Sequence, residues 1–254
     1  MNLRFDGKTA LVTGASTGIG AAIAIALGTS GARVALHYNR GREEAEKVAA
    51  AIRDGGGAET ILAQADLTDP PQADRLVRAV DDAFGRIDIL ANNAGGLLDR
   101  RPVAEMSDDD FARVMELNIG SAFRVCRAVI PVMKRTGGAI INLSSIAARN
   151  GGADGATLYA AAKAAVSTFT RGLAREMAPF GIRVNAIAPG IILTPFHDKY
   201  TPPELLRKMI SSIPLGRAAS AEEVAGPALF LASEQLSSFI TGEVIEVNGG
   251  ALMA

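Results

Sequence analysis

The sequence predicts an α/β protein with a doubly wound parallel sheet of about seven strands and helices on both faces. Short, continuously apolar runs alternate with longer amphipathic stretches along all 254 residues. Continuous apolar runs are typical of parallel strands, which are buried on both faces, and their alternation with helices indicates βαβ units. No linker or composition shift divides the chain, so residues 1–254 are expected to form a single domain.

The strands and helices are expected in strict alternation. Ser107 and Ser220 are plausible N-caps, because a hydroxyl accepts a free N–H of the first helical turn. The strands are expected at 8–13 (KTALVT), 33–38 (RVALHY), 59–64 (ETILAQ), 87–92 (IDILAN), 137–145 (GGAIINLSS), 182–190 (IRVNAIAPG) and 243–250 (EVIEVNGG). The helices are expected at 18–31, 41–57, 69–85, 107 to about 134, 157–178 and 220–233.

Composition and charge exclude several classes of function. The net charge is −1 without a block of like charges, which argues against a nucleic-acid or membrane-surface protein. No run of ~18 apolar residues predicts a transmembrane helix. The single Cys126 and a polar N-terminal stretch without an export signal favour the cytoplasm. One cysteine and two scattered histidines predict no metal site: His37 is expected to pack at a strand end and His197 to lie in an exposed loop.

A glycine-rich loop follows the first predicted strand. Gly14, Gly18 and Gly20 stand in TGASTGIG, at the start of the next helix. Glycine allows tight turns and close approach of a ligand, and a helix N-terminus attracts anions. The loop therefore predicts a pyrophosphate site, with an ordinary βα turn as the alternative. Its spacing fits neither G-x-G-x-x-G nor the phosphate loop of ATPases.

The end of the second strand should meet the adenosine ribose, where an acidic residue would favour NAD. Tyr38 stands there, followed by Asn39 and Arg40. A guanidinium can hold a 2′-phosphate, and Ser16 could add a hydroxyl, so NADP is favoured over NAD. A solvated Arg40 is the alternative. Further along, Asp66 and Leu67 are expected beside the adenine and Asn92–Gly95 beside the cofactor, with ordinary loop residues as the alternative.

Four polar residues fall near strand ends or on inward helix positions: Asn118, Ser145, Tyr159 and Lys163. Tyr159 and Lys163 are one helical turn apart, so they share a face. A nearby ammonium favours the phenolate and lowers a tyrosine pKa, which would suit an acid–base group. Singly, each residue also has a plain structural interpretation, such as a helix kink at Asn118, a capped turn at Ser145 or a solvated Lys163.

Taken in order, these motifs resemble the short-chain dehydrogenase/reductase family in its compact single-domain branch. The matching motifs are T-G-x-x-x-G-I-G at 13–20, N-N-A-G at 92–95, Asn118, Ser145, Y-x-x-x-K at 159–163, A-P-G at 188–190 with Thr194 beyond it, and ITGEVIEVNGG at 240–250. The resemblance implies a Rossmann-like fold, a nicotinamide cofactor and oxidoreduction of a carbonyl or alcohol. Tyr159 is then the general acid/base, and Lys163 lowers its pKa. Ser145 would hydrogen-bond the substrate oxygen, and Asn118 would bind a water in a proton path.

The resemblance also implies a set of cofactor contacts. Thr194 would bond the nicotinamide carboxamide, Ile192 would offer its backbone amide, and Lys163 would reach the ribose hydroxyls. The full set of expected cofactor-binding residues is Gly14, Ser16, Thr17, Gly18, Ile19, Gly20, Tyr38, Asn39, Arg40, Asp66, Leu67, Asn93, Ala94, Gly95, Tyr159, Lys163, Pro189, Gly190, Ile192 and Thr194. Residues 194–213 show no strand pattern and are expected to form a mobile substrate lid.

The substrate stays open at this stage. Within the family the chain is similar to 3-oxoacyl-carrier-protein reductases and to reductases of sugars and related carbonyls. Carrier-protein reductases commonly place a basic residue where this chain has Phe180, although Arg135 could serve as another basic contact. Arg100 and Arg101 could meet an acidic or phosphorylated substrate, but solvated arginines are the favoured interpretation.

Two alternatives to an NADP-dependent reductase are kept. One is an NAD-dependent sugar or alcohol dehydrogenase, and the other, less favoured, is a non-catalytic protein that senses NADP. A homotetramer or homodimer is expected from the family, paired through the helices at 107–134 and 157–178. The second helix is apolar on more than one face, as a helix buried on two sides would be.

Overall fold

The computed structural model describes residues 3–253 and shows a seven-stranded sheet in which every neighbouring pair is parallel. The strand order is β3-β2-β1-β4-β5-β6-β7, which confirms the predicted doubly wound fold. The strands are β1 (Thr9–Val12), β2 (Arg33–Tyr38), β3 (Thr60–Gln64), β4 (Ile89–Asn92), β5 (Gly138–Leu143), β6 (Ile182–Pro189) and β7 (Val244–Val247).

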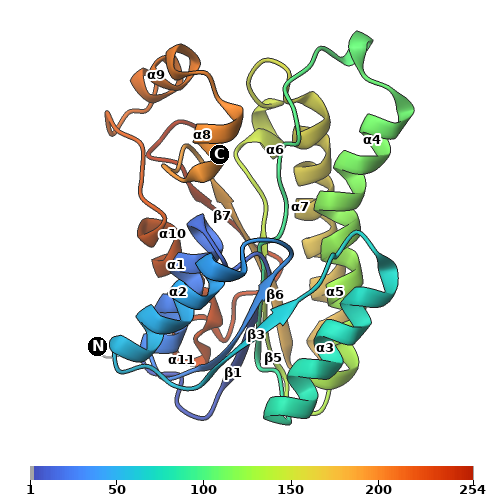
Figure 1. Ribbon diagram of the computed structural model, residues 1–254, viewed down its shortest axis with the longest axis vertical. Coiled ribbons are helices and arrows are strands. Elements are labelled where there is room, and N and C mark those ends of the chain that lie inside the picture. The colour runs from blue at the N-terminus through green and yellow to red at the C-terminus, as the bar shows by residue number, and fades with distance from the viewer. Residues whose placement is uncertain (1–2, 254) are drawn as a thin grey trace.

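Helices cover both faces of the sheet, and each face has its own apolar core (Figure 1). Ile23 and Val224 belong to the core on one face, and Val80 and Val129 to the core on the other. The first face carries α1 (Gly18–Thr29), α2 (Arg42–Asp54), α10 (Glu222–Ala232) and the short α11 (Glu234–Ser237). The second carries α3 (Pro70–Phe84), α4 (Asp108–Met115), α5 (Ser121–Met133) and α7 (Thr157–Met177).

The chain reverses its direction of travel across the sheet at β1. This strand pairs with β2 on one side and with β4 on the other. In open α/β sheets a crevice forms at such a switch point, outside the carboxyl ends of the strands, and ligands bind there. The glycine loop follows β1 directly, so the fold places the predicted phosphate site at this crevice.

The long helix predicted from residue 107 to about 134 is not a continuous α-helix. Ser107 caps it as predicted, in a capping box with Asp110. Between α4 and α5, however, residues Glu116–Gly120 form a π-helical turn. The Asn118 amide donates to the carbonyls of Val114 and of Gly96, both at 2.9 Å. A side chain that bonds the helix backbone competes with the regular ladder, and π turns are frequent at functional sites.

Two further details refine the sequence-based prediction. The α10 helix is assigned from Glu222, but Ala221 is already helical, and the Ser220 N–H donates to the Glu223 carboxylate at 3.0 Å, as the N-cap backbone does in a capping box. Residues 194–213 contain two short helices, α8 (Pro195–Tyr200) and α9 (Pro203–Ser211), and no strand. A last short helix, α6 (Ala147–Asn150), follows β5. Within residues 3–253, none of the helices is both long and apolar enough to cross a membrane.

Candidate active site

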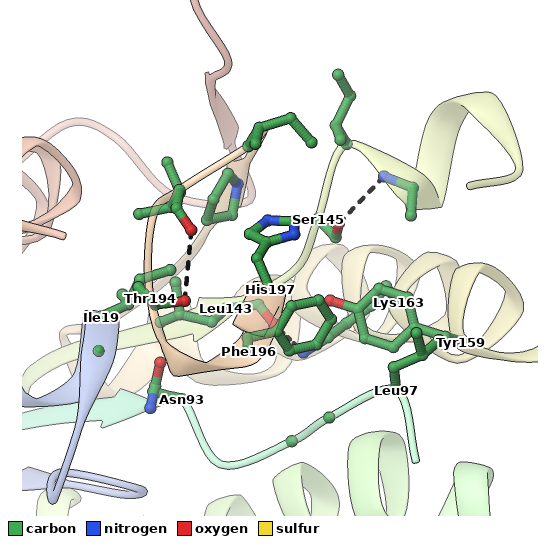
Figure 2. A pocket seen from close by; sticks show the side chains of 18 of the residues that line it. Ile19, Asn93, Leu97, Leu143, Ser145, Tyr159, Lys163, Thr194, Phe196 and His197 are labelled. Atoms are coloured by element: carbon green, nitrogen blue, oxygen red, sulfur yellow. Dashed lines mark hydrogen bonds between the residues drawn. The ribbon is translucent and has the colours of Figure 1, made fainter. Parts of the chain in front are cut away.

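A cavity of about 580 Å³ lies at the carboxyl ends of the central strands (Figure 2). The glycine loop forms one end of its wall, and α7 together with the segment 194–213 forms the other. Most of the predicted site residues meet here, although they come from distant parts of the sequence. The predicted residues in the wall are Gly14, Ser16, Thr17, Gly18, Ile19, Asn39, Arg40, Asn93, Ala94, Gly95, Ser145, Tyr159, Lys163, Pro189, Gly190, Ile192 and Thr194.

The glycine loop has the geometry that an anion site requires. Gly14 and Gly18 adopt φ of +62° and +56°, in the left-handed region that favours glycine. A Cβ on Gly20 would lie 2.1 Å from the Gly14 carbonyl oxygen, so only glycine fits behind the loop. Thr17 is the N-cap of α1 and makes no side-chain cap bond, which leaves the first N–H groups of the helix for a ligand. These features fit a bound pyrophosphate.

Two polar side chains hold this loop in place by hydrogen bonds to its backbone. Asn93 donates from its amide to the carbonyls of Thr13 and Gly14, both at 3.0 Å. The His37 Nδ1 accepts the Gly14 N–H at 3.0 Å, so its Nε2 carries the proton and donates to the Ala65 carbonyl at 3.0 Å. Burial lowers the pKa of His37, which keeps the ring neutral. His37 is therefore the packing residue that the sequence predicted, with the added task of positioning the loop.

At the adenosine end of the cavity, Asn39 and Arg40 lie in the wall and Tyr38 does not. The side chains of His37 and Tyr38 face opposite sides of the sheet, because they are adjacent on β2. His37 therefore lines the cavity, and Tyr38 is buried away from it. Hydrogen bonds from Thr68 lower the pKa of Asp66, with smaller contributions from Asn39 and Arg40, so its carboxylate lies beside this end. The Leu67 side chain packs in a core cluster, which leaves only its backbone for the cofactor.

Lys163 and Tyr159 lie one turn apart on α7, as their spacing predicted. The Lys163 ammonium is 5.8 Å from the centre of the Tyr159 ring and donates to the Leu143 carbonyl at 2.8 Å. Its side chain is buried, and this burial lowers the pKa of Lys163 to about 8. The Leu143 carbonyl, at the end of β5, therefore holds the Lys163 ammonium at the cavity. No sequence motif predicts this partner.

Ser145 presents its hydroxyl to the same space as Tyr159. Its oxygen accepts the Ala147 N–H at 3.1 Å, so the hydroxyl proton is left to donate. Burial raises the pKa of Tyr159, while the hydrogen bond with Ser145 and the charge of Arg100 lower it. With the pKa above its ordinary value, Tyr159 is a protonated phenol at neutral pH and can act as an acid.

Asn118 lies behind the cavity wall, against the loop at Gly95. Its amide oxygen accepts the Gly96 N–H at 3.1 Å, and its amide nitrogen donates to the carbonyls of Gly96 and Val114. A Cβ on Gly95 would lie 2.7 Å from the Asn118 oxygen and 3.2 Å from the Lys163 ammonium. The side chain thus holds the loop close to Lys163, and the water that it would hold stays a prediction.

The segment 194–213 places an aromatic cluster beside Tyr159. The Phe196 ring lies 6.0 Å from that of Tyr159 and packs edge-on to His197 (Figure 2). It also packs edge-on to Tyr200. The prediction that His197 is an exposed loop residue is wrong. It is buried on α8, and its Nδ1 lies 3.0 Å from the Thr201 hydroxyl, one helical turn on. Only the i, i+4 spacing of His197 and Thr201 could have suggested this.

The prediction that Arg100 is solvated is also wrong. Its guanidinium donates to the carbonyls of Tyr200 at 2.6 Å and Asp154 at 3.0 Å, and it lines the cavity. Its neighbour Arg101 instead pairs with Asp99 and Asp110, outside the cavity wall. Two adjacent arginines thus have different surroundings, which composition alone does not reveal. Within residues 3–253, no group of histidine, cysteine and acidic side chains is arranged to hold a metal ion.

The comparisons with known proteins agree with this geometry. Residues 14–251 match the family model described as enoyl-(acyl carrier protein) reductase. A 3-oxoacyl-[acyl-carrier-protein] reductase from Synechocystis is 40% identical over 247 residues, which cover 97% of each chain. The chain belongs to the short-chain dehydrogenase/reductase family. It is accordingly an oxidoreductase that acts on the CH–OH/C=O pair.

Solved members of the short-chain dehydrogenase/reductase family share the whole architecture. One from Mycobacterium marinum superposes with a TM-score of 0.93 at 33% identity, covering 100% of this chain and 98% of the other. An NADH-dependent reductase responsible for alginate metabolism gives a TM-score of 0.90 at 36% identity, covering 98% of both chains.

The buried Lys163 predicts a pH-dependent stability. Its pKa is about 8 in the folded protein against 10.5 ordinarily, so the unfolded chain binds more protons between these values. Stability relative to Lys163→Met should therefore rise with pH, by about 2 kcal/mol between pH 7.5 and pH 9.5. Urea unfolding at several pH values measures this, and Lys47→Met, at an exposed lysine of α2, corrects for the loss of one charge. A pH-independent difference would show that Lys163 is not a buried ammonium.

Proposed function

We propose that this chain is an NADP(H)-dependent oxidoreductase that reduces a carbonyl substrate, with Tyr159 as the general acid. The observation that carries the proposal is the convergence of Tyr159, Ser145 and Lys163 on one cavity that also holds the glycine loop. When bound, the nicotinamide supplies the hydride for the carbonyl carbon. The residues of the chain have to bind and orient the cofactor and the substrate, and to protonate the substrate oxygen.

The proposed roles follow from the observed hydrogen bonds. Tyr159 gives its phenolic proton to the substrate oxygen, and Ser145 donates a second hydrogen bond that stabilises the charge developing there. Lys163 is held by the Leu143 carbonyl beside the tyrosine, where its positive charge favours the phenolate that is left. Thr194 would hold the nicotinamide amide, and a water at Asn118 would return the proton. In the oxidative direction the same groups act in reverse.

The adenosine end supports NADP(H) over NAD(H). Arg40, Asn39 and Ser16 line this end, and no acidic residue lies in the wall of the cavity to bond a ribose 2′-hydroxyl. A guanidinium can hold a 2′-phosphate through paired charge-assisted bonds.

Arg40→Ala should weaken NADPH binding by about 10–100-fold and NADH binding by less than about threefold, because only NADPH carries the phosphate. Because the chain has no tryptophan, titration of the fluorescence of each reduced cofactor with the protein measures both affinities. Equal effects on the two cofactors would remove Arg40 from the 2′-phosphate site.

The relatives make a 3-oxoacyl thioester the first substrate to test. The curated relative at 40% identity is a 3-oxoacyl-[acyl-carrier-protein] reductase, so an acyl carrier protein is a candidate partner. However, the surface that would contact an acidic carrier protein lacks the basic residue that carrier-protein reductases commonly have there. Phe180 is exposed beneath the Lys134 ammonium, which lies 3.7 Å from its ring, and Arg135 is paired with Asp81.

A second candidate function is the oxidoreduction of a small sugar or alcohol, with NAD(H) as the alternative cofactor. The likeness to the NADH-dependent reductase responsible for alginate metabolism favours it. A screen of acyl thioesters, cyclic ketones and sugars, with NADPH and NADH in parallel, separates the two candidates. If no carbonyl in the panel were turned over while NADPH bound tightly, the chain would be a sensing protein and the proposal would be wrong.

The proposed assembly is a homodimer or homotetramer. A groove between α5 and α7 exposes the Phe123 ring, which packs edge-on to Phe169 at 6.4 Å. A partly exposed apolar groove of this kind supports pairing with a second copy. We expect sedimentation velocity at micromolar concentration to show dimers or tetramers, and Phe123→Asp to shift the protein towards the monomer. A wild-type monomer at these concentrations would contradict this expectation.

A further inference from the structure

Arg100 is a cation that lies beside the reacting groups and forms no salt bridge among residues 3–253, although the charge of Asp154 partly offsets the lowering of its pKa by burial. Its guanidinium donates to two backbone carbonyls and, at 3.4 Å, to the Thr201 hydroxyl. Its neighbour Arg101, in contrast, is paired with acidic residues. Each terminal nitrogen makes one of these bonds and keeps a second N–H. The two remaining N–H groups can donate to the oxygens of an anion.

The cavity wall carries several basic side chains and no acidic one. The basic residues are His37, Arg40, Arg100, Lys163 and His197. Arg40 belongs to the adenosine end, His37 and His197 bond protein groups, and Lys163 is held by the Leu143 carbonyl. Arg100 lies at the opposite end from Arg40, where it bonds residues that flank the aromatic cluster over Tyr159.

The charge of Arg100 reaches the catalytic tyrosine. It lowers the pKa of both Tyr159 and His197, so its guanidinium is close to the site where a substrate oxygen would be protonated. A half-buried cation near the reacting groups, with free donors and no acid in the surrounding wall, favours a negatively charged occupant. A neutral acyl chain would leave this charge unpaired.

We propose that Arg100 determines substrate specificity by binding an anionic group, a carboxylate or a phosphate, on a small carbonyl substrate. The inference rests on the proposed carbonyl reductase function and narrows its substrate class. The Arg100 guanidinium holds one end of the substrate, and Tyr159 and Ser145 meet the carbonyl oxygen at the other. An anion site at Arg100 favours small oxo acids and phosphorylated ketones over neutral thioesters as substrates.

A structural role for Arg100 gives a different expectation. The Tyr200 carbonyl lies at the end of α8, so the guanidinium also caps this helix and joins the segment 194–213 to residue 154. If this clamp were its whole role, removing it would slow all substrates by the same factor. The decisive quantity is therefore the ratio of kcat/KM for a charged substrate to kcat/KM for its neutral counterpart.

The test compares matched pairs with NADPH: 4-oxopentanoate, 5-oxohexanoate and 3-oxocyclohexanecarboxylate against their methyl esters, and dihydroxyacetone phosphate against dihydroxyacetone. The wild type should prefer the charged member of at least one pair, and which pair it is distinguishes a carboxylate site from a phosphate site. Arg100→Gln should lower that preference by about 10–100-fold, the loss typical of a hydrogen bond to a charged group. Arg100→Lys should keep part of the preference, because lysine has the positive charge but lacks the paired N–H donors of the guanidinium.

Arg101→Gln is the matched control, since Arg101 is adjacent and outside the cavity wall. It should leave the preference unchanged. Equal losses on both members of a pair in Arg100→Gln, or a wild type that prefers the neutral members, would overturn the inference.

A binding measurement separates this inference from the proposed function. Calorimetric titration of the protein–NADP⁺ complex with 4-oxopentanoate and with dihydroxyacetone phosphate needs no turnover. If one anion bound the wild type and not Arg100→Gln while no carbonyl were reduced, the reductase function would be wrong and the anion site would stand. If neither anion bound the wild type or were preferred in turnover, the inference would be overturned.

Discussion

Tyr159→Phe is expected to lower kcat for carbonyl reduction by about 10²–10⁴-fold, the contribution typical of a general acid. The change removes only the phenolic oxygen, so the ring can still pack 6.0 Å from Phe196 and the fold should be kept. NADPH affinity should change by less than about threefold, because the glycine loop and Arg40 lie at the other end of the cavity. Stopped-flow absorbance of NADPH and fluorescence titration measure the two effects separately.

Lys163→Met would remove the tuning ammonium and, by the proposed mechanism, also lower kcat. In this variant the loss of rate should be largest below pH 8, where Lys163 of the wild type is a charged ammonium, and smaller above it. Full activity of Tyr159→Phe with any reducible carbonyl would assign proton transfer to another group.

Gly20→Ala is expected to weaken NADPH binding by at least about 100-fold, a loss of about 3 kcal/mol. The new Cβ would lie 2.1 Å from the Gly14 carbonyl oxygen and 2.5 Å from the Asn93 amide nitrogen. Neither neighbour can retreat easily, because the Asn93 amide bonds Thr13 and Gly14 on the same side. The loop must therefore move away from the position in which its N–H groups face the pyrophosphate.

The control for this change is Gly226→Ala, in the exposed part of α10. No atom lies within 4 Å of the Cβ that it would add, so this variant should bind NADPH as the wild type does. If Gly20→Ala bound NADPH as tightly as Gly226→Ala does, the glycine loop would not be the pyrophosphate site.

The sheet could be predicted because each strand is a continuous apolar run between clear turn signals. The same regularity gives the site, since residues that follow parallel strands gather at one edge of the sheet. Tyr159, Lys163 and Ser145 meet in the cavity for this reason. The spacing of four between Tyr159 and Lys163 is a local property of a helix, and it needs no knowledge of the tertiary structure.

The features that could not be predicted all depend on contacts between distant segments. The π turn at Asn118 depends on the Gly96 carbonyl, and the position of Arg100 depends on the carbonyls of Tyr200 and Asp154. His197 is buried only because α8 folds over Tyr159. Backbone carbonyls are the partners of Asn118 and Arg100, and a carbonyl carries no signature in the sequence.

Transfer of deuterium from stereospecifically labelled [4-²H]NADPH to a reduced product would show directly that this chain moves hydride from the cofactor to a carbonyl carbon. The protein is incubated with each labelled diastereomer of the cofactor and the carbonyl panel, and the alcohols are analysed by mass spectrometry. We expect one deuterium on the carbinol carbon from one diastereomer only, because in the proposed site Thr194 and the glycine loop hold the cofactor with one ring face towards Tyr159. NADPH that binds without transferring deuterium to any product would contradict the account and indicate a binding protein in place of an oxidoreductase.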